Sequence, residues 1–101
     1  MSLSKTKNVE ILGKPGVARQ LTAGATSSGA YFSDNVFRIS MRAVGADIRF
    51  VIGQGTQTAD ASTSHFIADG ERLDFSITDG AYIAVIRDAS TDGVLEVTEL
   101  G

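Results

Sequence analysis

Hydrophobic and polar residues alternate with a period of two along most of this chain. That period is typical of β-strands with one buried face, whereas amphipathic helices repeat every three to four residues. Glycines flanked by Asp, Ser, Thr and Asn separate the alternating segments and predict turns. The predicted strands cover residues 36–43, 46–53, 63–68, 72–77, 81–88 and 94–100, with weaker segments at 9–12 and 17–21.

Seven to nine short strands within 101 residues restrict the architecture. A chain of this size buries one face of so many strands by closing them into a sandwich or a barrel. We therefore expect an all-β fold, an antiparallel β-sandwich of jelly-roll type, with a small β-barrel as the alternative. The length suits one domain over residues 1–101, in which the polar residues 1–8 are expected to form a flexible leader.

Two pairs of consecutive strands have the pattern of β-hairpins. In the first, residues 43–46 form the loop, and apolar residues meet at each inward rung. In the second, residues 78–80 form the turn, and Gly80 is free to adopt a positive φ. The opposed pairs are Met41/Ile48, Ile39/Phe50 and Phe37/Ile52 in the first hairpin, and Phe75/Ile83 and Leu73/Val85 in the second.

A second apolar surface is predicted outside the main core. The segment Tyr82–Ile86 is apolar on both faces, and Val36 and Val51 lie on the outward faces of their own strands. Either a sandwich partner or another subunit must cover such a surface. Tyr82 and Ile86 are therefore candidate interface residues of a homo-oligomer. The polar loop 53–62 is too poor in large apolar residues to pack a core, and we expect it to be mobile.

Arg38, Arg42 and Arg49 form a basic stripe on one outward face of the first predicted hairpin. Such a stripe is either a solvated face partly paired with Asp47 or a docking site for an acidic partner or an adjacent subunit. Arginine is favoured at interfaces because its planar guanidinium binds carboxylates in two places and stacks on other groups. We include these three arginines among the candidate interface residues.

Composition excludes several classes of function. Nine Lys and Arg against twelve Asp and Glu give a net charge of −3, which disfavours nucleic acid as a partner. The chain has no cysteine, so disulfides, thiolate catalysis and zinc sites with sulfur ligands are absent. No apolar run approaches the roughly 20 residues of a membrane-spanning helix. We expect no cofactor, no nucleic-acid partner and no membrane partner.

The segment Asp88–Glu99 matches the pattern of an EF-hand calcium loop. Asp88, Ser90 and Asp92 supply oxygens at positions 1, 3 and 5, Gly93 occupies position 6, and Glu99 occupies position 12. A functional loop needs a helix on each side, whereas the flanking segments here have the pattern of strands. Because Asp and Gly are also common in ordinary turns, we interpret the segment as a turn without metal.

His65 is the only histidine, and Asp60, Ser62 and Ser64 are close to it in sequence. Adjacent strand residues such as Ser64 and His65 point to opposite faces, and no Gly-x-Ser-x-Gly motif is present. We therefore expect an ordinary strand histidine and no catalytic residues. The Gly53–Thr58 segment also lacks the lysine and the helix of a phosphate-binding loop.

Four segments in the C-terminal two-thirds of the chain are similar to a known group of proteins; they lie at 38–53, 64–72, 83–87 and 93–100. They resemble small proteins encoded in the structural-gene regions of tailed bacteriophages and prophages. This resemblance implies a β-sandwich virion protein that acts in assembly or surface decoration, in the virion or in the bacterial cytoplasm during assembly, beside other virion proteins. We therefore expect a non-enzymatic structural protein; the alternatives are a carbohydrate-binding or host-receptor-binding module and a hydrolytic enzyme.

Overall fold

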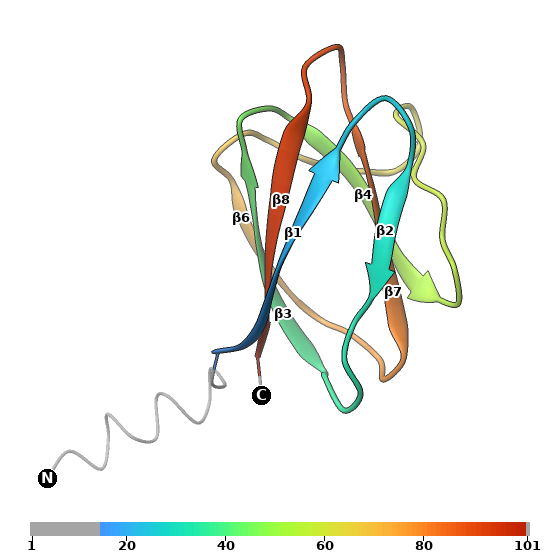
Figure 1. Cartoon of the computed structure of the whole chain (residues 1–101), viewed down its shortest axis with the longest axis vertical. Coiled ribbons are helices and arrows are strands. Elements are labelled where there is room, and N and C mark those ends of the chain that lie inside the picture. Colours follow the sequence, from blue (N-terminus) through green and yellow to red (C-terminus); the bar gives the residue numbers. More distant parts are fainter. Residues whose placement is uncertain (1–14, 101) are drawn as a thin grey trace, which may run out of the picture.

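The computed structural model describes residues 15–100 of the chain, which form eight antiparallel strands and no helix (Figure 1). The predicted strand at 9–12 and the leader at 1–8 lie outside the described residues. The strands are β1 (Pro15–Ala23), β2 (Ser28–Tyr31), β3 (Arg38–Val44), β4 (Ile48–Gln54), β5 (His65–Ile67), β6 (Arg72–Ser76), β7 (Ala81–Arg87) and β8 (Gly93–Leu100).

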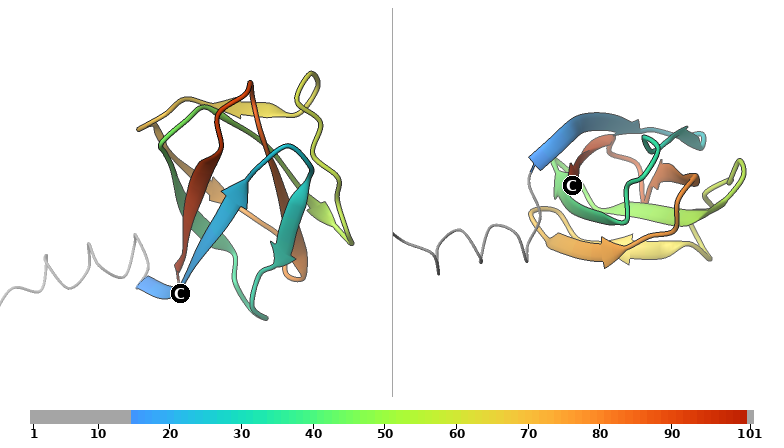
Figure 2. Two further views of the ribbon diagram at one scale, coloured as in Figure 1. Left: turned by 45° about the horizontal axis from the view of Figure 1, so that its top comes forward. Right: turned by 90° about the horizontal axis from the view of Figure 1, so that it is seen from below.

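The eight strands form two sheets of four that enclose a common core. Sheet A has the order β1-β8-β3-β6 and sheet B has the order β2-β7-β4-β5. Viewed along the strands, β1 and β2 lie at one side of the molecule and β5 and β6 at the other (Figure 2). The described residues thus form two separate sheets and no closed barrel, so the barrel alternative is wrong.

Both predicted hairpins are wrong in their pairing, although the strands themselves are present. β3 pairs with β6 and β8, whereas β4 pairs with β5 and β7, so residues 45–47 carry the chain from one sheet to the other. β6 and β7 are separated between the sheets in the same way. Gly80 has a positive φ of 80°, as expected, but the turn that contains it connects β6 of sheet A to β7 of sheet B. Met41 and Ile48, which were expected to be neighbours in one sheet, belong to opposite sheets and to one buried core cluster.

The core lies between the inner faces of the two sheets. Most residues predicted to point inward are buried, but Phe37 and Phe75 are 54% and 38% exposed. Phe75 lies on β6, the edge strand of sheet A, and Phe37 lies just before β3. Val36, expected to face outward, is buried instead. The largest fully buried side chains are Ile39, Met41, Ile48, Ile67, Ile83, Val85, Leu95 and Val97.

The strand β2 was not predicted, because its four residues lack large alternating apolar side chains. It pairs with β7 so that Gly29 lies opposite Ala84 and Tyr31 opposite Tyr82. A Cβ atom added at Gly29 would lie 2.2 Å from the backbone oxygen of Ile83 and 2.7 Å from the Tyr82 ring. Only glycine allows β2 to approach β7 beneath that ring.

Candidate interaction surface

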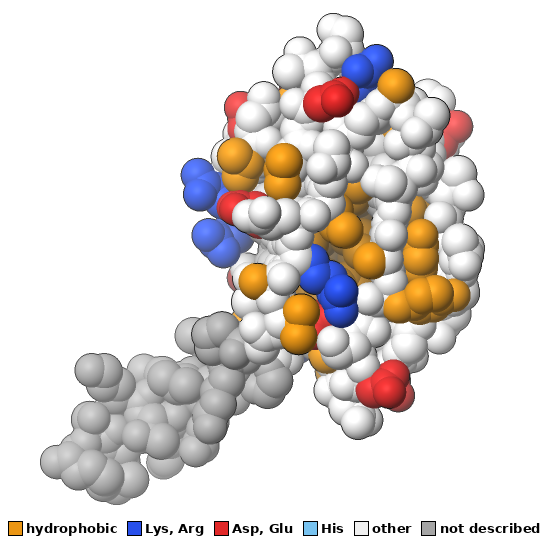
Figure 3. All heavy atoms as spheres, viewed as in Figure 1, with side chains coloured by type: hydrophobic (Ala, Val, Ile, Leu, Met, Phe, Trp, Pro, Cys, Tyr) orange, Lys and Arg blue, Asp and Glu red, His pale blue; other side chains and the backbone are white. Residues whose placement is uncertain are grey.

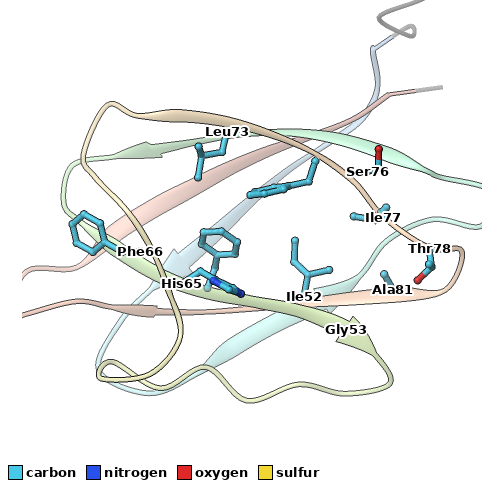
Figure 4. Close-up of a pocket in the computed structure, with 11 residues that line it drawn as sticks. Ile52, Gly53, His65, Phe66, Leu73, Ser76, Ile77, Thr78 and Ala81 are labelled. Carbon is cyan, nitrogen blue, oxygen red and sulfur yellow. The ribbon is translucent and has the colours of Figure 1, made fainter.

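The two sheets separate at the side where their edge strands β5 and β6 lie, and this leaves an apolar cleft of about 490 Å³ (Figure 4). Phe50 forms its floor, with ring centroids 5.8 Å from Phe75 and 5.5 Å from His65. The rim carries the hydroxyls of Ser76 and Thr78. The other apolar lining residues are Ile52, Phe66, Leu73, Ile77 and Ala81. A cleft of this size and lining suits apolar side chains or an apolar ligand group.

The residues near His65 form hydrogen bonds with one another within a turn. The Asp60 carboxylate accepts hydrogen bonds from the Ser62 amide and hydroxyl, at 2.8 and 2.6 Å, and these bonds lower the pKa of Asp60. The Ser64 hydroxyl accepts a bond from the Asp60 amide at 2.8 Å. Within the described residues, no hydrogen bond connects His65 to these groups. His65 is an exposed residue of β5, as expected.

The outer face of sheet A carries a charged cluster along the β6 edge. Arg42 on β3 lies opposite Arg72 on β6, and Ser40 lies opposite Asp74. Arg38 lies opposite Ser76 at the end of the same pair of strands. Figure 3 shows basic side chains gathered along this side of the molecule with acidic ones beside them. Two of the three predicted arginines therefore lie together, and Arg72, which the sequence reasoning missed, joins them.

Arg49 does not belong to that cluster, because β4 lies in the other sheet. Its Nε donates to the Asp88 carboxylate at 2.7 Å, and its Nη1 donates to the Ser64 carbonyl at 3.1 Å. The guanidinium also lies 5.0 Å from the centre of the Phe66 ring. The prediction of one stripe through Arg38, Arg42 and Arg49 is wrong, since it depended on the first hairpin. Arg49 connects β4, β5 and the end of β7 within the same chain.

The loop after β4 lies on the outer face of sheet B. Thr56 contacts the Tyr31 hydroxyl at 3.3 Å, Gln57 packs against Gly53, and the Ala59 amide donates to the Ser27 hydroxyl at 2.8 Å. These contacts hold the loop against Tyr31 of β2, Gly53 of β4 and Ser27, which precedes β2. The loop expected to be mobile is therefore fixed at several points.

This loop changes the interpretation of the predicted apolar surface. Ala84, on the outer face of β7, is fully buried, and Ala59 in the loop is only 4% exposed. Tyr82 and Ile86 on the same face are half-buried. Part of the cover comes from the same chain, an option that the sequence reasoning did not include. Tyr82 also packs edge-on against Tyr31, with ring centroids 4.8 Å apart.

At the opposite side of the sandwich, hydrogen bonds join β1 and β8 to the segment after β2. Glu99 is 2% exposed, and its carboxylate accepts from Arg19 Nε at 3.2 Å and from the Ser33 amide at 2.9 Å. The second guanidinium nitrogen of Arg19 donates to the Ser33 hydroxyl at 3.3 Å. Burial alone would raise the pKa of Glu99, but the bonds from Ser33 and Arg19 outweigh it and lower that pKa. Sequence patterning gave no sign of this interaction.

The geometry of the EF-hand-like segment agrees with an ordinary turn. β8 begins at Gly93, so Glu99 lies six residues further along an extended strand, about 20 Å away at 3.3 Å per residue. The carboxylates of Asp88 and Asp92 pair with Arg49 and Arg87, at 2.7 and 2.8 Å. The residues of the motif therefore bind arginines and point to different parts of the molecule.

No group of three or more His, Cys, Asp or Glu side chains in residues 15–100 is arranged to hold a metal ion. The same part of the chain has no helix with the length and apolar character needed to cross a bilayer. Comparisons with models of known families, with curated proteins and with solved structures find no match to this chain. The site is therefore interpreted from its own geometry.

Proposed function

We propose that the two sheets form a jelly roll. Its strands pair as β1 with β8, β2 with β7, β3 with β6 and β4 with β5, all antiparallel. This is the pairing of one long two-stranded ribbon whose tip is the β4–β5 loop. Successive segments of the ribbon fall alternately in sheet A and sheet B, which is how a jelly roll is wound. Eight-stranded jelly rolls of this kind build viral capsid and lectin domains.

On this fold the chain acts as a non-enzymatic structural protein of a phage or prophage virion, in assembly or surface decoration. The observation that carries the proposal is the ribbon pairing together with an apolar cleft at one exposed side of the sandwich. Virion proteins act in many symmetric copies, and an exposed apolar cleft is typical of a surface that another protein covers. The charged cluster at β6 adds groups that fix the orientation of such a contact.

The proposal is tested on the particles themselves. Particles released after induction of the encoding genome are purified on a density gradient, and their proteins are quantified by mass spectrometry. We expect this chain in a fixed ratio to the major capsid or tail protein. Its absence from particles that contain the other structural proteins would contradict the proposal. Capsid, portal or tail genes next to its own gene are a second expected observation.

A carbohydrate-binding role is the second candidate, and the Tyr31–Tyr82 pair favours it. Tyr31 is 51% exposed and lies beside Tyr82 and the polar side chain of Thr56. Aromatic rings with a hydroxyl at one end are the groups that sugar-binding faces present. Tyr31→Ala should then abolish retention on a glycan array, while Phe66→Ala, an exposed aromatic elsewhere on sheet B, should leave it unchanged. No retention of the unaltered protein excludes this role.

A further inference from the structure

The strand β6 is an exposed sheet edge with unused backbone hydrogen-bonding groups. Glu71 and Ile77 use their carbonyl and amide groups to bond β3, through Ala43 and Phe37. Because antiparallel neighbours alternate between bonded and non-bonded pairs, the amides and carbonyls of Arg72, Asp74 and Ser76 point away from β3. β6 is the last strand of its sheet, so these groups point outward. Such an edge is a ready template for pairing with another strand.

The charges along β6 are complementary to those of the same strand running in the opposite direction. Arg72 and Asp74 are both exposed on the outer face of sheet A, two residues apart. The three ion pairs within residues 15–100 involve neither of them. Arg72 lies opposite Arg42, and Arg42 in turn lies opposite Glu96 on β8. Arg72 donates a hydrogen bond to the Ser40 hydroxyl at 3.2 Å. The strand therefore offers, at its open edge, one cation and one anion that take no part in these three ion pairs.

We propose that two copies of this chain associate through β6, paired antiparallel about a two-fold axis at Leu73. This contact is one form of the self-association expected of the proposed assembly role, and the inference rests on that role. The axis places Arg72 of each copy opposite Asp74 of the other, as a bonded backbone pair with opposite charges on the outer face. Leu73 meets Leu73 of the second copy as the intervening non-bonded pair. The two sheets A then become one sheet of eight strands.

The charges select this register over its neighbour. An axis at Asp74 would also align the outward backbone groups, but it would set two aspartates directly opposite each other, which is unfavourable. The Leu73 axis is perpendicular to sheet A, so it also brings the β5 and β6 sides of the two copies together. The apolar cleft of each copy then faces the cleft of the other. The exposed ring of Phe75 is covered in the same contact.

The other three edges are less suited to this pairing. Ser27, just before β2, accepts a hydrogen bond from the loop residue Ala59 through its hydroxyl, and β5 has only three residues. β1 has a register irregularity between Pro15 and Ala18, and it lies on the side joined by Glu99. β6 combines an open edge, self-complementary charges and an adjacent apolar cleft. For these reasons we identify the partner as a second copy through β6.

A cysteine cross-link tests the register, because the chain contains no natural cysteine. In the proposed dimer the two Leu73 Cα atoms are about 4.5 Å apart, within the range that a disulfide accepts. Leu73→Cys should therefore give a covalent dimer within minutes under mild oxidation, and at the same fraction over a tenfold range of protein concentration. Gln20→Cys, on the exposed opposite edge strand β1, is the matched control and should stay monomeric under these conditions. Equal cross-linking of both variants would overturn the proposal.

Charge reversal tests the pairing of Arg72 with Asp74. Arg72→Asp and Asp74→Arg each create two like-charge contacts across the axis, so each should raise the dimer dissociation constant at least about tenfold in sedimentation equilibrium. The double variant Arg72→Asp/Asp74→Arg restores opposite charges and should recover most of the affinity. Asp34→Arg carries the same charge change on an exposed loop and should dimerise as the unaltered protein does. Circular dichroism checks that each variant is folded.

The outcomes separate this contact from the proposed function. A dimer that none of the β6 variants weakens would overturn the β6 contact and leave the assembly role intact. A chain that stays at 10.6 kDa at every concentration up to the millimolar range would overturn the β6 contact as well. The assembly role itself fails only if the chain is absent from purified particles. Recovery in the double variant supports the contact, because a merely destabilised fold would not recover.

Discussion

The two sides of the sandwich, where the edges of sheet A and sheet B meet, differ in how they are closed. At the β1–β2 side, the buried carboxylate of Glu99 accepts hydrogen bonds from the Arg19 side chain and from the Ser33 amide. These bonds link sheet A to the segment that follows β2 of sheet B. At the β5–β6 side, aromatic and aliphatic residues surround a cleft of about 490 Å³, and none of the three ion pairs within residues 15–100 crosses it. One side is closed by the chain itself and the other is open.

This difference indicates where the molecule can accept a partner. The buried Glu99 carboxylate and the half-buried Arg19 fix one geometry at the first of these sides. An open cleft with Phe75 and Phe66 partly exposed keeps apolar area in water, which burial by a partner would remove. The closed side therefore serves stability, and we assign the open side to association.

The largest expected effect is a difference in stability loss between a buried residue of the open cleft, Phe50, and an exposed one, Phe75. Phe50→Ala should lower the free energy of unfolding by about 3 to 5 kcal/mol, because the ring is only 3% exposed and its loss leaves a cavity. Phe75→Ala should cost about 1 kcal/mol in the monomer, since that ring is 38% exposed. Urea denaturation at low protein concentration measures both. Equal losses would mean that the cleft is closed in solution.

The next effect concerns the closed side. Glu99→Ala leaves the Ser33 amide and the Arg19 guanidinium without their acceptor and should cost about 2 kcal/mol. Asp74→Ala, an acidic residue on the open edge of the same sheet, should cost less than about 0.5 kcal/mol in the monomer. Thermal melts of the two variants measure the contrast. If the two losses are equal, the buried carboxylate does not stabilise its side of the sandwich.

The sequence predicted most of the side chains that point inward, although not Val36, Phe37 and Phe75, and it did not predict which strands pair. Alternation requires Ile39 and Phe50 to be buried, and both are. The same alternation is expected when two such strands are neighbours in one sheet and when they face each other from opposite sheets. The short connection at residues 45–47 favoured a hairpin, whereas the chain crosses to the other sheet there. Pairing is decided by the whole ribbon, which involves contacts far apart in sequence.

The candidate surface was predictable only where it did not depend on pairing. Arg38 and Arg42 share a strand, so their common face follows from the period of two, but grouping Arg49 with them required the wrong hairpin. The role of Arg72 appears only when β6 is placed beside β3 at the edge of sheet A. The sequence singled out Glu99 only as the last position of the EF-hand-like pattern, because its partner Arg19 is 80 residues away in sequence.

A smaller effect is the pH dependence of the closed side. The hydrogen bonds lower the pKa of Glu99 in the folded protein below its ordinary value of 4.5. A lowered carboxyl pKa contributes stability that is fully present above pH 4.5 and is lost as the pH falls through the folded value. The difference in melting temperature between the unaltered protein and Glu99→Gln should therefore be constant from pH 7 to about 5.5 and shrink below pH 4.5. A difference that grows on acidification would mean that the pKa is raised.

The smallest expected effect is that of calcium, which should be none. Binding through the EF-hand-like pattern would require Glu99 to leave Arg19 and Ser33, and this would open the closed side of the sandwich. It would also require Asp88 to release Arg49. A site with a dissociation constant of about 1 mM would add about 1 kcal/mol of stability at roughly 5 mM calcium. We expect no rise in melting temperature and no heat beyond dilution in titration calorimetry at that concentration. Saturable one-to-one calcium binding that Glu99→Gln abolishes would contradict this expectation. It would show that the β1–β2 side opens more readily than its hydrogen bonds indicate.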